Sequence, residues 1–271
     1  MDIILVHLGN PTPKFQEVCI RQIEHFTKAR ILLCRNENDF SNAKAEEFKT
    51  HSYLQEFGMN GFWSYAALRL FYVEEVMAKY GLKTALHIEN DNLIYDDPEH
   101  TMMAEFCGEA VGLTQLTDDE LSAGVMYVGS RGALATITEK MTDLVKQGKD
   151  ALQAKYGPTW LQEMRLLKII YDENPGLIKL LPTLPNGSAH IFDCASWGQW
   201  VGGTFQDPGI PYAGSHHIVG RELISYRELA KYDVVWCNKT PWAIECKTKA
   251  LTKLFNLHIH SKQLERWKSY E

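Results

Sequence analysis

The chain has 271 residues, of which 45% are hydrophobic, 23% charged and 11% aromatic, and its formal net charge at pH 7 is −6. The negative charge excludes the broad basic field that is typical of nucleic-acid-binding proteins. The length suits one large α/β domain, and no stretch reaches the ~18 apolar residues that a membrane span needs.

The N-terminus and the cysteines favour a cytoplasmic protein. The opening residues, MDIILVHLGNP, have no basic segment and too short an apolar run for a signal peptide. The six cysteines are scattered and form no C-x-x-C pair, which is typical of reduced thiols rather than of a disulfide or zinc framework. We therefore expect a cytoplasmic protein.

The first segment predicts the opening of a parallel α/β unit. Ile3–Val6 and Ile31–Cys34 are short apolar runs, and apolar residues recur at helical spacing over Phe15–Phe26 between them. The loop at His7–Asn10 would then lie at the C-terminal edge of the sheet, where ligands bind in such folds. This loop is a candidate for contacting a nucleotide base, and a simple turn is the alternative.

A stronger helical pattern follows at Trp63–Lys79, and Gly81 is a suitable end for this helix. Arg69 stands among the apolar residues of the pattern, and a buried charge needs a partner. That partner is either a structural carboxylate or an anionic or sugar ligand beside Asp91.

The stretch Thr84–Asp97, TALHIENDNLIYDD, predicts a buried strand that ends in carboxylates. Glu89 and Asp91 are two positions apart, so in an extended chain their side chains point the same way. Two oxygen donors on one side suit Mg²⁺ or Mn²⁺. The alternative is an Asn/Asp-rich turn with no ligand.

The middle of the chain shows no chemical motif. It predicts a strand at Val125–Val128, one long helical region from about Arg131 to Tyr156, and another helix around Trp160–Tyr171. Most of the many charges in this region are expected on a solvated face.

The segment Ala189–Gly203, AHIFDCASWGQWVGG, predicts a strand followed by a helix. Asp193 stands at the junction, where its side chain can cap the helix, and this structural role is the alternative to any catalytic one. The next loop, Thr204–Gly214, contains Asp207 and has the proline and glycine content of loops that often form substrate walls.

The last predicted strand is Lys253–His260, KLFNLHIH, in which polar and apolar residues alternate. His258 and His260 lie on its polar face, and Lys262 follows shortly after. The two histidines are either exposed or able to supply a further metal ligand, with Lys262 as a phosphate contact.

Four of these blocks together resemble nucleotide-sugar-dependent glycosyltransferases of the GT-A fold, and in particular a group of such enzymes found in bacteria and large DNA viruses. The blocks are FWSYAALRLFYVEE, LHIENDNLIY, FDCASWGQWVGG and NLHIHSK. The resemblance implies one α/β domain with a mixed, mainly parallel central sheet flanked by helices. Residues 1–110 would form the nucleotide-sugar-binding half, and residues 111–271 the acceptor-binding half with a C-terminal segment that binds metal and diphosphate.

The resemblance also implies roles for particular residues. E-N-D takes the place of the family's D-x-D, with Asp91 as the direct ligand of Mn²⁺ or Mg²⁺. We expect Glu89, His258 and His260 as further metal ligands. The expected nucleotide-sugar contacts are His7, Gly9, Asn10, Arg69, Asn90, Ser261 and Lys262. The expected acceptor contacts are Trp197 and Asp207. Asp193 ranks first and Glu222 second as the catalytic carboxylate, because a base must be held within reach of the acceptor hydroxyl.

The predicted activity is transfer of a hexosyl or pentosyl group from a UDP- or GDP-sugar to a hydroxyl of a glycan or other acceptor, without nucleic acid as a partner. One alternative is a metal-dependent sugar-phosphate nucleotidyltransferase, which would usually carry a glycine-rich basic loop where this chain has HLGNPTPKF. The other is a non-catalytic nucleotide-sugar-binding protein. Phosphate-loop, dinucleotide-fingerprint and hydrolase-elbow motifs are absent from the sequence.

Overall fold

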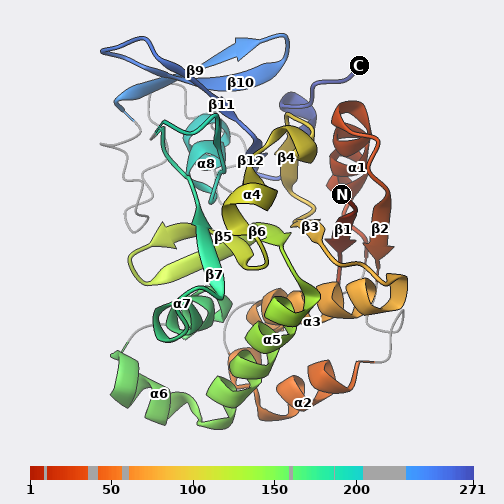
Figure 1. Cartoon of the computed structure of the whole chain (residues 1–271), viewed down its shortest axis with the longest axis vertical. Helices are drawn as coiled ribbons and strands as arrows, with labels where there is room; N and C mark the ends of the chain where they lie inside the picture. The colour runs from red at the N-terminus through yellow and green to blue at the C-terminus, as the bar shows by residue number, and fades with distance from the viewer. Residues whose placement is uncertain (9–10, 36–41, 57–60, 159–160, 186, 204–229) are drawn as a thin grey trace.

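The computed structural model describes residues 1–8, 11–35, 42–56, 61–158, 161–185, 187–203 and 230–271. A six-stranded sheet in the order β2-β1-β3-β6-β5-β7 runs through its centre (Figure 1). Its strands are β1 (Ile3–Val6), β2 (Ile31–Cys34), β3 (Ala85–Ile88), β5 (Val111–Thr117), β6 (Glu120–Val128) and β7 (Ile178–Leu181). Only β6 pairs antiparallel with its neighbours in this sheet, which confirms the predicted mixed, mainly parallel α/β architecture.

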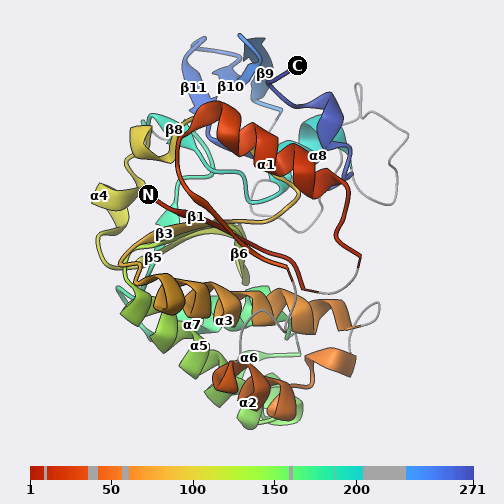
Figure 2. The same ribbon diagram turned by 90° about the vertical axis from the view of Figure 1, so that its right-hand side faces the viewer.

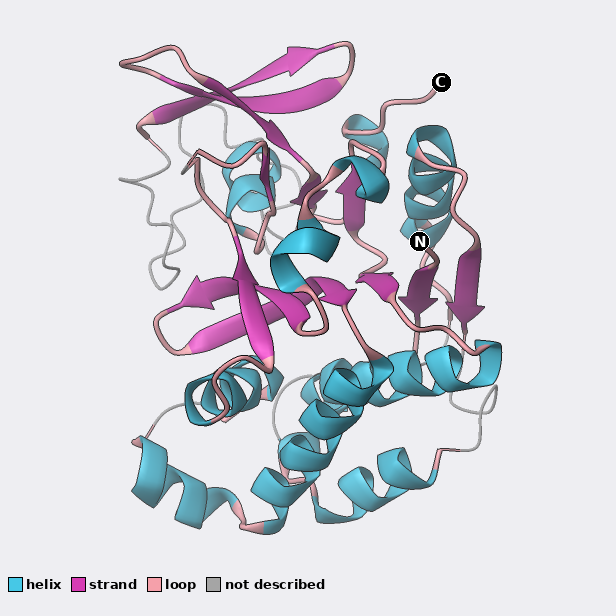
Figure 3. Ribbon diagram, in the orientation of Figure 1, coloured by secondary structure: helices cyan, strands magenta, loops and turns pink. Residues whose placement is uncertain are grey.

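Helices cover both faces of this sheet (Figures 2 and 3). Helices α3, α5 and α7 pack on one face, and α1 lies across the other. Each face of the sheet has its own hydrophobic core, because side chains alternate between the two faces along a strand. In β1, Ile4 and Val6 belong to the core under α3, α5 and α7, whereas Ile3 and Leu5 belong to the core under α1. The helices are α1 (Phe15–Phe26), α2 (Ala43–His51), α3 (Phe62–Tyr80), α4 (Met103–Cys107), α5 (Arg131–Lys146), α6 (Lys149–Tyr156), α7 (Glu163–Glu173) and α8 (Ser196–Gly202).

Helix α3 confirms the predicted helix almost to the residue. Its end is set by Gly81, which adopts the left-handed conformation at φ 63°. The backbone N–H of Leu82 then bonds to the carbonyl of Met77, which satisfies a carbonyl that the helix leaves free. Among the helices that the structure describes, none is long and apolar enough to cross a membrane.

Two predicted elements are each divided in the structure. The long helical region predicted from Arg131 to Tyr156 breaks at Gly148, whose φ of 82° is incompatible with a continuous helix. The strand predicted at Lys253–His260 is two strands, β11 (Leu251–Leu254) and β12 (Asn256–His258), which pair with different partners.

Strand β11 belongs to a second sheet, and β12 belongs to the site. The second sheet has the order β8-β11-β10-β9 and lies at the top of Figure 1, with β8 (His190–Ile191), β9 (Tyr232–Cys237) and β10 (Thr240–Glu245). Strand β12 instead pairs antiparallel with β4 (Asn92–Ile94), and His258 lies opposite Asn92. This pairing carries the C-terminal segment to the end of β3.

Candidate active site

The acidic residues after β3 lie on a turn rather than on an extended chain. Glu89 follows the last strand residue, and the backbone N–H of Asn92 bonds to the carbonyl of Glu89, which closes a turn through Asp91. The expectation that an extended backbone would align the two carboxylates was therefore wrong. The Asn/Asp-rich turn is real, and it is the turn that brings both carboxylates to the same place.

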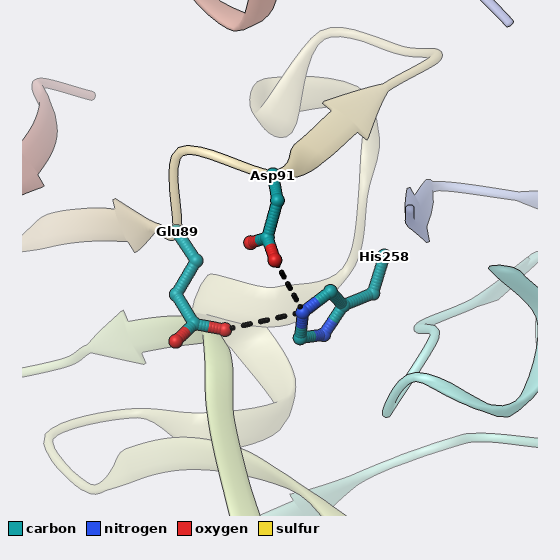
Figure 4. A group of neighbouring side chains, drawn as sticks. All are labelled: Glu89, Asp91 and His258. Carbon is teal, nitrogen blue, oxygen red and sulfur yellow. Dashed lines mark hydrogen bonds and ion pairs between the residues drawn. The ribbon is translucent and has the colours of Figure 1, made fainter. Parts of the chain in front are cut away.

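His258 completes a cluster with these two carboxylates (Figure 4). Its Nε2 atom lies 3.1 Å from Oδ2 of Asp91 and 3.5 Å from Oε2 of Glu89. One ligand atom from each residue can be chosen so that all lie within 4.8 Å of one another. The chain positions are far apart, yet the pairing of β12 with β4 holds His258 beside Asp91.

The donor set fits a divalent cation. Two carboxylate oxygens from the turn after β3 and one imidazole nitrogen from β12 converge, as in protein sites for first-row divalent metals. Space for them is left by Gly124 on β6, where a Cβ atom would come within 2.9 Å of Oε2 of Glu89 and 3.1 Å of Nδ1 of His258. The residues present therefore suit a metal ion, with Asp91, Glu89 and His258 as its protein ligands.

Lys262 adds a positive charge to the same cluster, because its Nζ contacts Oδ2 of Asp91. Burial alone would favour the neutral form of Asp91, but the nearby His258 and Lys262 outweigh it and hold the pKa of the Asp91 carboxyl well below its ordinary value. Asp91 is therefore an anion at neutral pH, as a metal ligand must be.

Arg69 on α3 connects this cluster to a carboxylate that the sequence did not single out. Its guanidinium contacts Oε1 of Glu89, and its Nη2 lies 3.5 Å from Oε1 of Glu163. Glu163 is 2% exposed, and burial raises its pKa to about 7, with Arg69 acting in the opposite direction. The structural carboxylate that was one alternative for Arg69 is thus Glu163, with Glu89 as a second partner.

Asp193 is held as a cap. Its side chain is buried and accepts hydrogen bonds from the backbone N–H groups of Ala195, Trp197, Gly198 and His258. Burial raises the pKa of this carboxyl, and the bonds from backbone N–H groups oppose that rise. An oxygen that already accepts two N–H bonds is poorly placed to take a proton from a substrate, so the geometry favours the structural alternative for Asp193 over the catalytic base.

Other predicted site residues lie nearby with different roles. Trp197 is fully buried in the core and donates its Nε1–H to the carbonyl of Thr183, so burial argues against the predicted acceptor contact. The amide of Asn90 accepts a hydrogen bond from Gln16 and donates one to the carbonyl of Val6, which fastens the acidic turn to β1. The side chains of Trp197 and Asn90 thus make structural contacts around the site.

Three further predicted residues surround the cluster. The ring of His260 is half-buried and meets the ring of His258 edge to face, with centroids 6.1 Å apart, but it is not a member of the ligand group. Ser261 is buried, and His7 is half-buried at the end of β1. The remaining predicted residues, Gly9, Asn10, Asp207 and Glu222, lie outside the described part of the chain.

Comparison with known proteins gives a likeness of fold. No family model matches the chain, and no curated protein sequence matches it. A solved glycosyltransferase involved in glycosylation of the major capsid of PBCV-1 is 11% identical with a TM-score of 0.41, and the match covers 69% of this chain and 85% of that one. Mouse xyloside xylosyltransferase 1 is 11% identical with a TM-score of 0.44, over 72% of this chain and 88% of that one.

A third solved structure is the galactosyltransferase LgtC in complex with donor and acceptor sugar analogues. It is 13% identical with a TM-score of 0.42, and the match covers 71% of this chain and 76% of that one. These proteins are glycosyltransferases, the class that the sequence blocks resemble. Because every one of these TM-scores is below 0.5, the likeness carries no argument about function, which rests on the site.

Proposed function

We propose that the protein is a divalent-metal-dependent glycosyltransferase that moves a sugar from a nucleoside diphosphate sugar, of the UDP or GDP type, to a hydroxyl of a glycan acceptor. The observation that carries the proposal is the meeting of Glu89, Asp91 and His258, with Lys262 beside them, at the end of β3. In sheets of this kind the carboxyl ends of the strands are where nucleotides bind.

The cluster suits a diphosphate leaving group. Negative charge grows on the diphosphate as its bond to the anomeric carbon breaks, and fixed positive charge stabilises that state. A bound Mn²⁺ or Mg²⁺ would supply such charge as a Lewis acid. Lys262 would meet the phosphate oxygens from the side of Asp91, and Arg69 would keep Glu89 oriented toward the metal. The first 110 residues would contribute most of the nucleotide contacts, and His258 and Lys262 would reach them from the C-terminal half.

An inverting reaction also needs a base for the acceptor hydroxyl. Of the two carboxylates that the sequence ranks for this role, Asp193 has its oxygens occupied by backbone N–H groups. Glu222 therefore becomes the first candidate. Glu222→Gln should abolish transfer to an acceptor while donor binding persists; transfer at the wild-type rate would exclude Glu222.

The test is a panel of UDP- and GDP-sugars incubated with the purified protein, with Mn²⁺ or with a chelator, and analysed for release of nucleoside diphosphate. We expect release, with or without an added acceptor, that depends on metal. Release of pyrophosphate from a nucleoside triphosphate and a sugar phosphate would instead identify a nucleotidyltransferase. A rise in thermal stability with a nucleotide sugar but no product would identify a binding protein.

A further inference from the structure

The carboxylate of Asp193 connects helix α8 to the backbone of His258. Its Oδ1 accepts hydrogen bonds from the backbone N–H groups of Ala195 and Trp197, both at 2.9 Å. Its Oδ2 accepts from Gly198 at 2.7 Å and from His258 at 2.8 Å. One buried side chain therefore fixes both the first turn of the helix and the strand residue that faces the metal site.

Helix α8 also touches β12 directly at this point. Gly198 has no side chain, and a Cβ atom there would lie 1.9 Å from the carbonyl oxygen of His258 and 3.0 Å from Oδ2 of Asp193. Such distances are far below van der Waals contact. The absence of a side chain at Gly198 thus allows the helix to approach the backbone of His258 closely enough for the Asp193 bonds to form.

A second set of bonds extends from Asp193 to the acidic turn. The backbone N–H of Asp193 donates to Oδ1 of Asn256 at 2.9 Å. The amide of Asn256 donates in turn to the carbonyl of Asp193 at 3.2 Å and to Oδ1 of Asn92 at 2.7 Å. Asn92 is the residue after Asp91, so the same buried network reaches both segments that carry metal ligands.

The imidazole of His258 receives its orientation from this framework. Metal-binding histidines usually donate their second ring nitrogen to a partner that fixes the ring. Among the described residues, Nδ1 of His258 is buried and has no hydrogen-bond partner, and it faces Gly124. Apart from the contact of its Nε2 atom with Asp91, the position of the ring then comes from packing and from the backbone of His258.

We propose that Asp193 is a positioning residue for the metal site, which acts through the backbone N–H of His258 and not through contact with substrate. The inference rests on the metal site of the proposed function. A carboxylate is needed because all of its neighbours are donors: an asparagine would turn its own N–H₂ group toward two of the backbone N–H groups, which leaves them without acceptors. The first turn of α8 would then loosen from β12 and release His258.

The experiment is a titration of the metal-free protein with Mn²⁺, in which electron paramagnetic resonance measures the free ion. We expect Asp193→Asn to bind Mn²⁺ about 10–100-fold more weakly than wild type, the range found when groups behind a metal ligand are changed. The matched control is Asn42→Ala, because Asn42 is also a buried helix cap but lies at the start of α2. It should lower thermal stability and leave Mn²⁺ affinity unchanged.

Gly198→Ala is the second variant, and it tests the positioning role if Asp193→Asn does not fold. It retains the carboxylate but pushes the helix away from His258, so it should also weaken Mn²⁺ binding. Unchanged Mn²⁺ affinity in either folded variant overturns the positioning role. If wild type binds Mn²⁺ and Asp193→Asn loses it, while no nucleotide sugar is turned over, the proposed function fails and the positioning role stands.

Discussion

Arg69 and Glu163 are 3.5 Å apart between Nη2 and Oε1, and their contact joins the middle of α3 to the first turn of α7 beneath the acidic turn. Both side chains are almost removed from water, with exposed fractions of 13% for Arg69 and 3% for Glu163. The charge of Arg69 is thus shared between Glu163 and Glu89. Glu163 thus reaches the ligand group through Arg69 rather than as a member of it.

The raised pKa of Glu163 predicts a pH-dependent stability. In the folded protein this carboxyl keeps its proton up to about pH 7, whereas in the unfolded chain it releases it near pH 4.5. Between these values the folded state binds more protons at this carboxyl, so the contribution of Glu163 to the free energy of unfolding falls as pH rises through the window, by up to about 3 kcal/mol. The buried His87, whose pKa is lowered to about 3 by burial, acts in the opposite direction below pH 6.5, so the effect of Glu163 is read from the difference between variant and wild type. Glu163→Gln should gain stability relative to wild type as pH rises from 5 to 7, with unfolding free energies measured in urea.

Glu173→Gln is the control, because Glu173 lies on the same helix but near its exposed end. It should leave the slope between pH 5 and pH 7 close to that of wild type. A difference in unfolding free energy between Glu163→Gln and wild type that stays constant from pH 5 to pH 7 would contradict the assignment to Glu163.

Asp91→Asn should remove Mn²⁺ binding. The substitution keeps the shape of the side chain but loses the charge that faces His258 and Lys262. We expect Mn²⁺ affinity to fall by about 100-fold or more, since the lost group is a ligand rather than a support, and turnover should fall with it. Far-ultraviolet circular dichroism checks the fold, and Asp172→Asn on the surface of α7 should behave as wild type. Near-normal activity of Asp91→Asn at saturating Mn²⁺ would refute the ligand role.

Lys262→Ala should affect catalysis more than donor binding. The charge that Lys262 meets develops mainly as the diphosphate departs, so kcat should fall by about 10²–10³-fold while KM for the donor changes little. Steady-state kinetics at saturating Mn²⁺ provide the measurement. Lys155→Ala, which removes a surface ion pair with Glu173, is the control. A variant in which only KM for the donor rises would make Lys262 a uniform binder.

The two C-terminal histidines should separate clearly. His258 belongs to the ligand group, whereas His260 is not a member of that group and packs against the ring of His258. His258→Ala should raise the Mn²⁺ concentration needed for half-maximal activity by about 10-fold or more, whereas His260→Ala should change it much less. Equal and mild effects of both substitutions would remove His258 from the ligand set.

Local patterns in the sequence were sufficient to predict much of the framework. The apolar periodicity and Gly81 defined α3, and the run before Glu89 defined β3, because both depend on neighbours in the chain. The break at Gly148 was missed, since helical periodicity continues on both sides of it and only the backbone angle reveals it. The segment Lys253–His260 was predicted as one strand, although it contains parts of β11 and β12. The two strands pair with different partners, and such a change does not alter the alternation of polar and apolar residues in the sequence.

The site was predicted in part for similar reasons. Glu89, Asp91 and His258 were found from their residue types, although the turn that joins the first two was read as extended. Glu163 was missed because at the start of a helix an acid is ordinary, and only the packing of α7 under Arg69 gives it a role. Asp193 was predicted as either a helix cap or the catalytic carboxylate. The four backbone N–H bonds to its oxygens, which favour the cap, include one from the distant His258 and could not be seen in the sequence.

The pairing of β12 with β4 has a consequence for how the protein folds. Asp91 and His258 are 167 positions apart, so the cluster forms only after the chain has been synthesised beyond His258 and β12 has paired with β4. Contacts of such large sequence separation form late and slowly. A bound divalent ion would then stabilise the pairing of β12 with β4 after it has formed. Binding of the ion during refolding would therefore report that the native topology is complete.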